Sequence, residues 1–195
     1  MVEDAECLKE IDPPDDCRHR FAAVQFRGTR WDLGHLDSFA FRSHIGFEVT
    51  VVVIFSCHCF RRGLPGAAAE ACHFPSEDVF RDAREQRLLD PSRYALSRLW
   101  LRGLVLSMPE QHIIIAQARH RNFMTWRALP DGHANAIYAM FFTVERDTRR
   151  KGRMILRVQS AYLLDSGLTR AQKEGRKVRL RTLLKAAYEG RSIRP

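Results

Sequence analysis

The residues of this chain best suited to chemistry are a histidine between two arginines and a later pair of hydroxyls. Arg119-His120-Arg121 forms a polar turn between two apolar segments. Neighbouring guanidinium groups lower the pKa of a histidine, so His120 is predicted to be a neutral base near pH 7. The arginine forks suit phosphate oxygens. The alternative is a solvated, charged hairpin turn with no chemical role.

The hydroxyl pair closes a predicted strand at Ser160-Ala161-Tyr162. In a regular strand Ser160 and Tyr162 share a face with Met154, Leu156 and Val158, while Arg157 points to the other face. Both hydroxyls can donate hydrogen bonds to a phosphate, and the tyrosine ring can stack on a base. The alternative is that both side chains are buried and satisfied by backbone groups.

A cysteine–histidine cluster offers a different chemistry. Thiolates and imidazoles suit zinc, and Cys57, Cys59, Cys72 and His73 are the predicted ligands. Their spacing differs from ordinary structural zinc sites, whose paired cysteines have about two to four residues between them. The alternatives are buried cysteines acting as small hydrophobes and a catalytic thiol at Cys57 or Cys59. No cofactor is otherwise expected.

Charge is unevenly spread along the 195 residues, whose formal net charge is +9. Residues 1–20 hold seven acids against three cations, giving −4, whereas residues 146–195 hold fifteen Lys and Arg against four acids, giving +11. This predicts a polyanion partner, with the acidic end as a partial electrostatic mask. The alternative is an arginine-rich surface that only maintains solubility. The predicted nucleic-acid contacts are Arg119, Arg149, Arg150, Lys151, Arg153, Arg176, Lys177, Arg179 and Arg181.

Composition also bounds the cellular context. No run of about 18 apolar residues exists, so no membrane contact is expected. The acidic first twenty residues lack the apolar core of a signal peptide. The five cysteines are therefore expected to be reduced thiols in a cytoplasmic protein.

The elements that must position these residues follow from local patterns. Phe47–Phe55 is rich in β-branched residues and predicts a central strand buried on both faces. Asp90 followed by Pro91 predicts the start of the main helix, which Pro109 ends. The other predicted elements are a surface helix over 77–89, strands over 112–116 and 122–126, a hairpin over 138–162 and a last strand over 177–184.

Together these elements predict an α+β fold. An antiparallel sheet of about five strands packs against one main helix. Residues 1–45 are expected to be a loosely ordered, partly flexible N-terminal extension, and residues 46–195 a single α+β domain.

Four segments carry a resemblance: Ser-Cys-His-Cys-Phe-x-Arg at 56–62, Asn-Phe-Met-Thr at 122–125, Tyr-Ala-Met-Phe-Phe at 138–142 and Val-Gln-Ser-Ala-Tyr-Leu-Leu-Asp at 158–165. They resemble a family of uncharacterised bacterial proteins, some labelled stationary-phase growth adaptation protein or heat-shock protein. The resemblance covers about residues 45–195. It implies a shared fold and transfers no activity.

The closing pattern is also distantly similar to the barnase–EndoU–colicin–RelE group of metal-free ribonucleases. In that group a helix precedes a four-stranded antiparallel sheet, and a hydroxyl residue with a nearby tyrosine often closes a late strand. The likeness implies His120 as the base, Arg121 or Arg157 as the phosphate clamp, and Ser160 and Tyr162 as auxiliary donors.

The leading hypothesis is a toxin-like RNA-binding protein that cleaves RNA without a metal. One alternative is a non-enzymatic module of toxin–antitoxin or phage-defence type, which binds nucleic acid or a protein such as an antitoxin. A third is a structural zinc protein built on the cysteine–histidine cluster.

Overall fold

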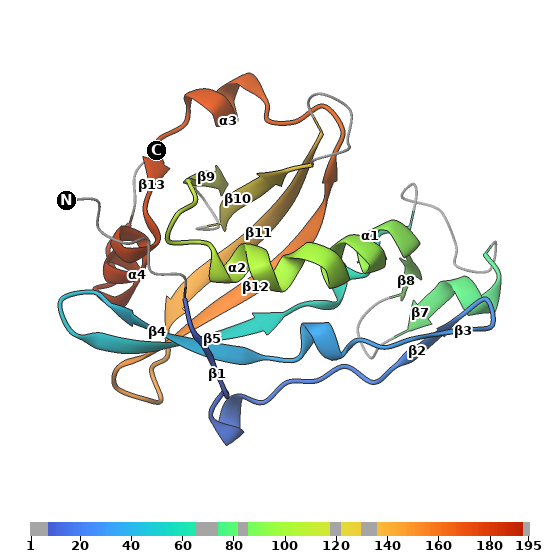
Figure 1. Ribbon diagram of the computed structural model, residues 1–195, viewed down its shortest axis with the longest axis horizontal. Coiled ribbons are helices and arrows are strands. Elements are labelled where there is room, and N and C mark those ends of the chain that lie inside the picture. Colours follow the sequence, from blue (N-terminus) through green and yellow to red (C-terminus); the bar gives the residue numbers. More distant parts are fainter. Residues whose placement is uncertain (1–7, 65–73, 82–85, 118–121, 130–135, 193–195) are drawn as a thin grey trace.

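A large mixed β-sheet, covered on one side by helices, forms the body of the protein in the computed structural model (Figure 1). The structure describes residues 8–64, 74–81, 86–117, 122–129 and 136–192. The eight strands of the sheet, in spatial order, are β1 (Glu10–Ile11), β4 (Phe39–His44), β5 (Glu48–Phe55), β12 (Arg153–Leu164), β11 (Ile137–Arg146), β10 (Asn122–Ala128), β9 (Ile113–Gln117) and β13 (Lys177–Val178).

The remaining elements are short strands, 3-10 turns and helices. Two small sheets contain β2 (Val24–Phe26) with β3 (Thr29–Trp31), and β6 (Arg61–Arg62), β8 (Gln86–Leu89) and β7 (Val79–Arg81). The 3-10 turns are η1 (Asp15–Cys17), η2 (Gly34–Leu36), η3 (Cys57–Cys59) and η5 (Ser76–Asp78). The helices are α1 (Pro91–Leu96), the π-turn η6 (Ser97–Leu101), α2 (Arg102–Leu106), α3 (Arg170–Glu174) and α4 (Leu180–Tyr188).

The predicted α+β class is confirmed. The observed sheet has more strands than predicted, and it contains both parallel and antiparallel pairs. β5 and β12 run parallel, whereas the other neighbours in the sheet are antiparallel. The expectation of about five antiparallel strands is therefore wrong. β5 confirms the predicted central strand, and its parallel partner is separated from it by about a hundred residues of chain, which local sequence patterns cannot reveal.

The main helix follows the predicted signals. The Asp90 carboxylate accepts a hydrogen bond from the Arg93 N–H at 3.0 Å, and Pro91 occupies the first helical position. The segments α1, η6 and α2 run on from one another across one side of the sheet (Figure 1). Within η6, Ser97 Oγ lies 2.8 Å from His35 Nε2, which ties the helix to η2.

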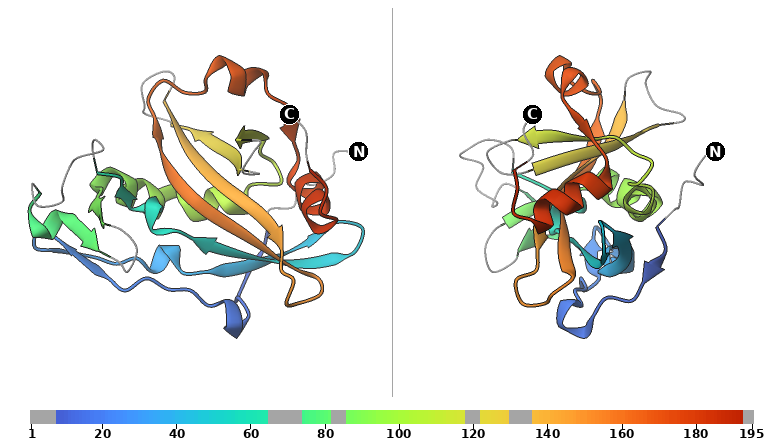
Figure 2. Two further views of the ribbon diagram at one scale, coloured as in Figure 1. Left: turned by 180° about the vertical axis from the view of Figure 1, so that it is seen from behind. Right: turned by 90° about the vertical axis from the view of Figure 1, so that its left-hand side faces the viewer.

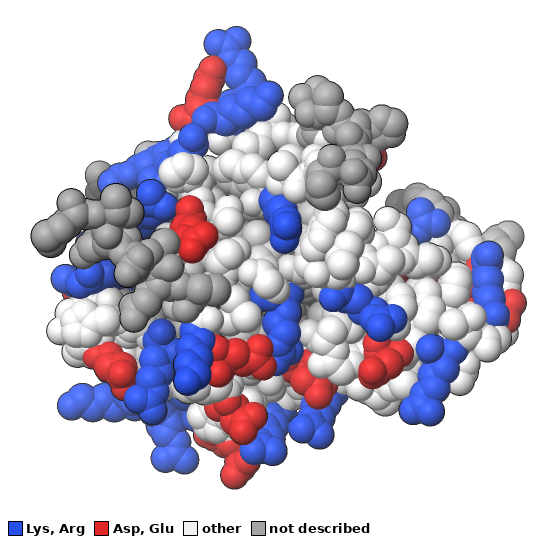
Figure 3. Space-filling view, viewed as in Figure 1, with Lys and Arg blue, Asp and Glu red and all other residues white. Residues whose placement is uncertain are grey.

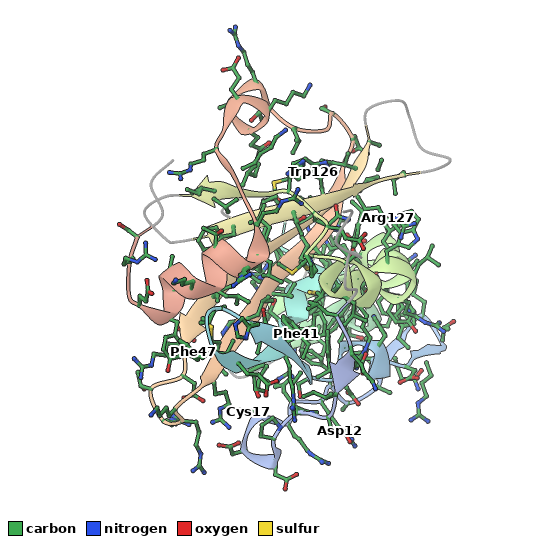
Figure 4. The ribbon with its side chains drawn as sticks, turned by 60° about the vertical axis from the view of Figure 1, so that its left-hand side comes forward. Asp12, Cys17, Phe41, Phe47, Trp126 and Arg127 are labelled. Carbon is green, nitrogen blue, oxygen red and sulfur yellow. The ribbon has the colours of Figure 1, made fainter. Side chains whose placement is uncertain are left out.

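We call the side of the sheet under this helix the inner face. It holds the main core, in which Leu101 and Leu104 of the helix pack with strand residues such as Phe41, Phe55 and Phe142. α4 closes the same core with Leu183 and Leu184. Figure 4 shows how β10 alternates between the faces: Arg127 lies on the helix side, where its guanidinium sits 5.5 Å from the Trp100 ring centroid, and Trp126 belongs to the other side.

The opposite side, the outer face, is covered only in part. At one end Ile11 and Cys17 pack over Ala40, Val52 and Ile155. At the other end Leu168 packs beside Ile114, Met124 and Ile137. Seen from behind, no described element crosses in front of the middle of β11 and β12 (Figure 2, left).

The N-terminal segment is part of the fold. Along its length β4 pairs with β5, so the predicted boundary between residues 45 and 46 falls inside a hairpin. Trp31, Leu33 and Leu36 are buried in the main core. The expectation of a loosely ordered extension is therefore wrong for residues 8–45, because their apolar side chains complete the core.

Two further element predictions are wrong. The described residues within 77–89 hold a 3-10 turn and two short strands, where one helix was expected. Residues 177–184 hold only a two-residue strand, after which α4 begins. The buried positions Leu180, Leu183 and Leu184 follow a helical spacing that the apparent alternation concealed. Within the described part of the chain, no helix is long and apolar enough to cross a membrane.

Candidate nucleic-acid interface

A β-bulge in β12 decides which predicted site residues lie together. Phe142 pairs with Val158 and Phe141 pairs with Ser160, so Gln159 is an extra residue on β12. The inner face therefore continues from Val158 to Ala161, and both are buried in the core. The prediction that Ser160 and Tyr162 share the face of Val158 is wrong: the bulge turns them outward.

On the outer face these hydroxyl residues now join Arg157. Arg157 and Ile155 precede the bulge on this face, and Ser160 and Tyr162 follow it. Arg157 is exposed, whereas Ser160 and Tyr162 are half-buried. The structure thus brings three of the five predicted catalytic residues to one face of one strand.

Tyr162 is the centre of a stack. Its ring lies parallel to Phe141, with centroids 5.3 Å apart and 19° between the planes. The Arg93 guanidinium lies 4.6 Å from the Tyr162 ring centroid. Since a ring has two faces, one partner takes each, and neither face is left for a nucleobase. Of Tyr162, only the hydroxyl is therefore available to a bound molecule. The half-buried ring of Phe141 is the aromatic surface that remains partly exposed beside it.

Arg93 is held in this position by the backbone of the turn around η3. Its Nη1 donates hydrogen bonds to the His58 carbonyl at 3.1 Å and to the Arg61 carbonyl at 2.8 Å. Burial lowers the pKa of Arg93, although an arginine remains charged. The stack is thus rigidly connected to the start of α1.

Next to Arg157 the outer face has a hollow, which lies between η1 and the turn of the β11–β12 hairpin. The hollow has a volume of about 390 Å³. Its lining is rich in charge: Asp16, Cys17, Ile54, Glu145, Arg146, Asp147, Thr148, Arg149, Arg153, Ile155 and Arg157. Two of the predicted nucleic-acid contacts, Arg149 and Arg153, therefore line one concave surface with Arg157, the predicted phosphate clamp.

Arg153 lies at the centre of this hollow and is fully paired. Its Nε donates to Asp147 Oδ2 at 2.6 Å, and its Nη1 and Nη2 donate to the two Asp16 oxygens at 2.7 and 2.8 Å. Its side chain is 8% exposed. These bonds raise the pKa of Arg153 and help hold the pKa of Asp147 below its ordinary value, together with the Arg149 N–H. The prediction of Arg153 as an open surface cation is therefore wrong.

The acidic segment accounts for this pairing, because Asp16 belongs to it. Arg150 Nε lies 3.8 Å from Asp16 Oδ2, and Glu10 pairs with Arg102. On the face seen in Figure 3, acidic and basic side chains alternate along the lower edge, where β1 and η1 lie in Figure 1. Figure 4 shows Cys17 on this N-terminal turn, below the sheet.

The remaining predicted cations fall into two separate groups. Arg149 and Lys151 are exposed at the hairpin, and Arg176, Lys177, Arg179 and Arg181 are exposed around β13 and α4. β13 is the far edge of the sheet, with β11, β10 and β9 between it and β12. The basic residues of the hairpin and those around β13 and α4 therefore lie on strands that are not neighbours.

His120, Arg119 and Arg121 lie outside the described residues. The chain that follows them enters β10 at Asn122, and Phe123 pairs with Phe142, which pairs with Val158. Asn122 is therefore level with Thr143 and Arg157, two strands away, or about 10 Å across the sheet.

The described part of the cysteine cluster lies in a helical turn. Cys57 and Cys59 lie in the 3-10 turn η3, which the Ser56 side chain caps. Burial raises the pKa of the Cys59 thiol to about 12, which opposes the thiolate that zinc binding or nucleophilic chemistry requires. Cys72 and His73 are outside the described residues, and no group of three potential metal ligands occurs among the residues that are described.

Two residues of the interface were not among those predicted. Asp16 occupies the Arg153 fork, and His19 lies near enough to Arg157 for that charge, after burial, to lower its pKa. The ring of His19 packs edge-on against Phe21 at 4.7 Å. The opposite charges of the two ends of the chain were the only sequence signal for this contact.

Comparison with known proteins relates this fold to one family. The family model described as YjaZ family matches residues 23–188, more than four-fifths of the chain. No curated protein and no solved structure matches, and no comparison links the chain to the metal-free ribonucleases. The match begins before β2 and so includes strands that were expected to lie outside the resemblance. The chain belongs to the YjaZ family.

Proposed function

We propose that this protein binds single-stranded nucleic acid, and RNA in particular, along the outer face of β11 and β12. The observation that supports this most directly is the bulge at Gln159, which puts Arg157 and Ser160 on one uncovered face. They lie between an arginine-lined hollow and the Phe141–Tyr162 stack. Cations beside hydroxyls and partly exposed aromatic side chains are the groups that hold a single strand.

Each group has a role in this proposal. Arg157 and Arg149 are exposed cations of the hollow and bind backbone phosphates in this proposal. Ser160 and the Tyr162 hydroxyl donate hydrogen bonds to phosphate or ribose oxygens. Phe141 offers its partly exposed ring to a base. Binding of this kind weakens with salt, because phosphate contacts release counterions.

The test is fluorescence anisotropy with a labelled single-stranded RNA of about 12 nucleotides. This length is within the range that a small domain that binds single strands covers. Arg157→Gln is expected to weaken binding about tenfold, from the loss of one charge-assisted contact. It should also lower the slope of log K against log salt by about 0.7. Arg30→Gln in β3 makes the same charge change on another sheet and is expected to leave affinity nearly unchanged.

A wild-type protein that binds neither RNA nor DNA at about 50 mM salt would reject the proposal. Equal weakening by Arg157→Gln and Arg30→Gln would also count against this surface, since only net charge would then matter. A duplex of the same sequence serves as the specificity control, because a flat sheet face suits an unpaired strand.

Cleavage of the bound RNA is a second proposal, supported by the register that pairs Phe123 with Phe142 and Phe142 with Val158, so that β10 begins beside the residues paired with Arg157. In metal-free cleavage a base takes the proton of a ribose 2′-OH, the 2′ oxygen attacks phosphorus, and the 5′ oxygen leaves with a proton from an acid. His120 is the base in this proposal, and Arg157 stabilises the charge on the phosphorane.

The measurement is gel analysis of labelled RNA incubated with the protein and EDTA. His120→Ala is expected to stop cleavage while anisotropy shows unchanged RNA binding. If the wild type binds RNA and leaves it intact, the protein is a binding module without this activity. If His120→Ala cleaves as fast as the wild type, another group is the base.

A further inference from the structure

The pairing of Asp16 with Arg153 has the geometry of a bound phosphate. Both terminal nitrogens of the guanidinium donate to the two carboxylate oxygens, at 2.7 and 2.8 Å. This fork-to-fork arrangement is the one that arginine adopts with phosphate oxygens. The Asp16 carboxylate therefore stands where two oxygens of a phosphate group would bind.

The two acids that hold Arg153 differ in how firmly they are fixed. The side chain of Asp147 is 10% exposed and is held by the Arg149 N–H at 2.9 Å. The side chain of Asp16 is 45% exposed and comes from a three-residue turn in another part of the chain. Asp147 thus orients the guanidinium through Nε, while Asp16 covers the Nη edge from the solvent side.

The surroundings of this edge favour an anion larger than a carboxylate. Arg149 and Arg157 line the same hollow, Arg150 lies 3.8 Å from the same Asp16 oxygen, and Cys17 and Ile155 form its apolar floor. The volume of about 390 Å³ accommodates a phosphate with part of its nucleoside. If Asp16 moved away, the Arg153 fork would open into this space beside Arg149 and Arg157.

We propose that this hollow is a nucleic-acid phosphate site and that Asp16 occupies it as an internal competitor. This inference rests on the proposed function, since the displacing phosphate belongs to the strand that lies along β12. An incoming phosphate binds the Arg153 fork in place of Asp16. The Asp16 carboxylate, which is 45% exposed, turns to solvent, and the phosphate oxygens replace its two hydrogen bonds to Arg153. The N-terminal segment thereby sets how tightly the strand is held.

The chain offers a closely matched test. Asp16→Asn removes the competing charge, whereas Asp15→Asn makes the same charge change in the same turn, where Asp15 pairs with Arg18. In the anisotropy assay Asp16→Asn is expected to bind RNA about fivefold more tightly than the wild type, as removal of an internal competitor requires. The RNA affinity of Asp15→Asn is expected to stay within about 1.5-fold of the wild type, because Asp15 pairs with Arg18 and its exposed charge is screened by salt.

The outcomes separate the two proposals. Equal affinities for Asp16→Asn and Asp15→Asn, with RNA still bound and still sensitive to Arg157→Gln, would overturn the competitor and leave the proposed function standing. No RNA binding by any form would reject the proposed function itself. Circular dichroism checks that Asp16→Asn is folded, and Asp16→Ser serves as the second variant: it should also bind more tightly.

Discussion

The ion pairs of Arg153 make the sharpest stability prediction, through the variant Arg153→Met. Methionine keeps much of the apolar stem but leaves Asp147 charged, 10% exposed and supported only by the Arg149 N–H among the described contacts. Removing one partner of a buried ion pair costs about 3–5 kcal/mol. We expect a loss near the lower value, about 3 kcal/mol, because Asp16 can turn to solvent.

The assay is urea unfolding followed by circular dichroism at pH 7. Arg150→Met is the matched control, since Arg150 lies in the same hairpin, is 67% exposed and reaches Asp16 only at 3.8 Å. It is expected to cost less than about 0.5 kcal/mol. Adding Asp147→Asn to Arg153→Met should recover part of the loss, because the stranded charge is gone.

The pH dependence gives an independent check on the same reasoning. The folded protein holds the pKa of Asp147 below its ordinary value, so this group stabilises the wild type above about pH 4. That contribution disappears as pH falls further. Protonation of Asp147 also relieves the stranded charge in Arg153→Met, so the gap between wild type and variant should narrow below about pH 4. A gap at pH 7 no larger than that of Arg150→Met would refute the argument.

Two further predictions concern His35 and the bulge. Burial, followed by the nearby Arg98 charge, lowers the pKa of His35 to about 4, so the folded state keeps it neutral while the unfolded chain protonates below about 6.5. Stability should therefore fall between pH 6.5 and pH 4 by about 1–2 kcal/mol, less than the full pKa shift would give because His35 is only half-buried and solvent screens its charge. His35→Gln should remove that part of the dependence in pH-resolved urea unfolding. Deletion of Gln159 removes the bulge and places Ser160 directly after Val158, so regular alternation still leaves Ser160 outward and Ala161 in the core. We therefore expect the deletion to have an unfolding midpoint close to that of Gln159→Ala, and a much lower midpoint would show that removing the extra residue does not preserve the faces.

Several elements could be predicted from local sequence because their signals are short-range. The β-branched run of β5 and the Asp90-Pro91 start of the main helix appear where they were expected. The β11–β12 hairpin follows in the same way from two apolar segments around a charged turn. Each of these three elements depends on residues within a few positions of one another, so the local sequence is enough to predict it.

α4 shows where local patterns conflict. Its residues alternate over 177–184 as a strand would, yet Leu180, Leu183 and Leu184 meet the core only as one side of a helix. Packing beside β11 decides between the two, because burying three leucines contributes more than the local preference for either conformation.

The tertiary structure decided which side chains share the face of Arg157. The amino-acid sequence by itself determined which groups are present: a basic C-terminal third, an acidic first segment, and hydroxyls at Ser160 and Tyr162. One extra residue at Gln159 then turned those hydroxyls to the face of Arg157, and an ion pair between residues 137 positions apart placed Asp16 on Arg153. Strand register and long-range charge pairing depend on partners brought together only by folding, so the sequence could name the charges but not which of them meet.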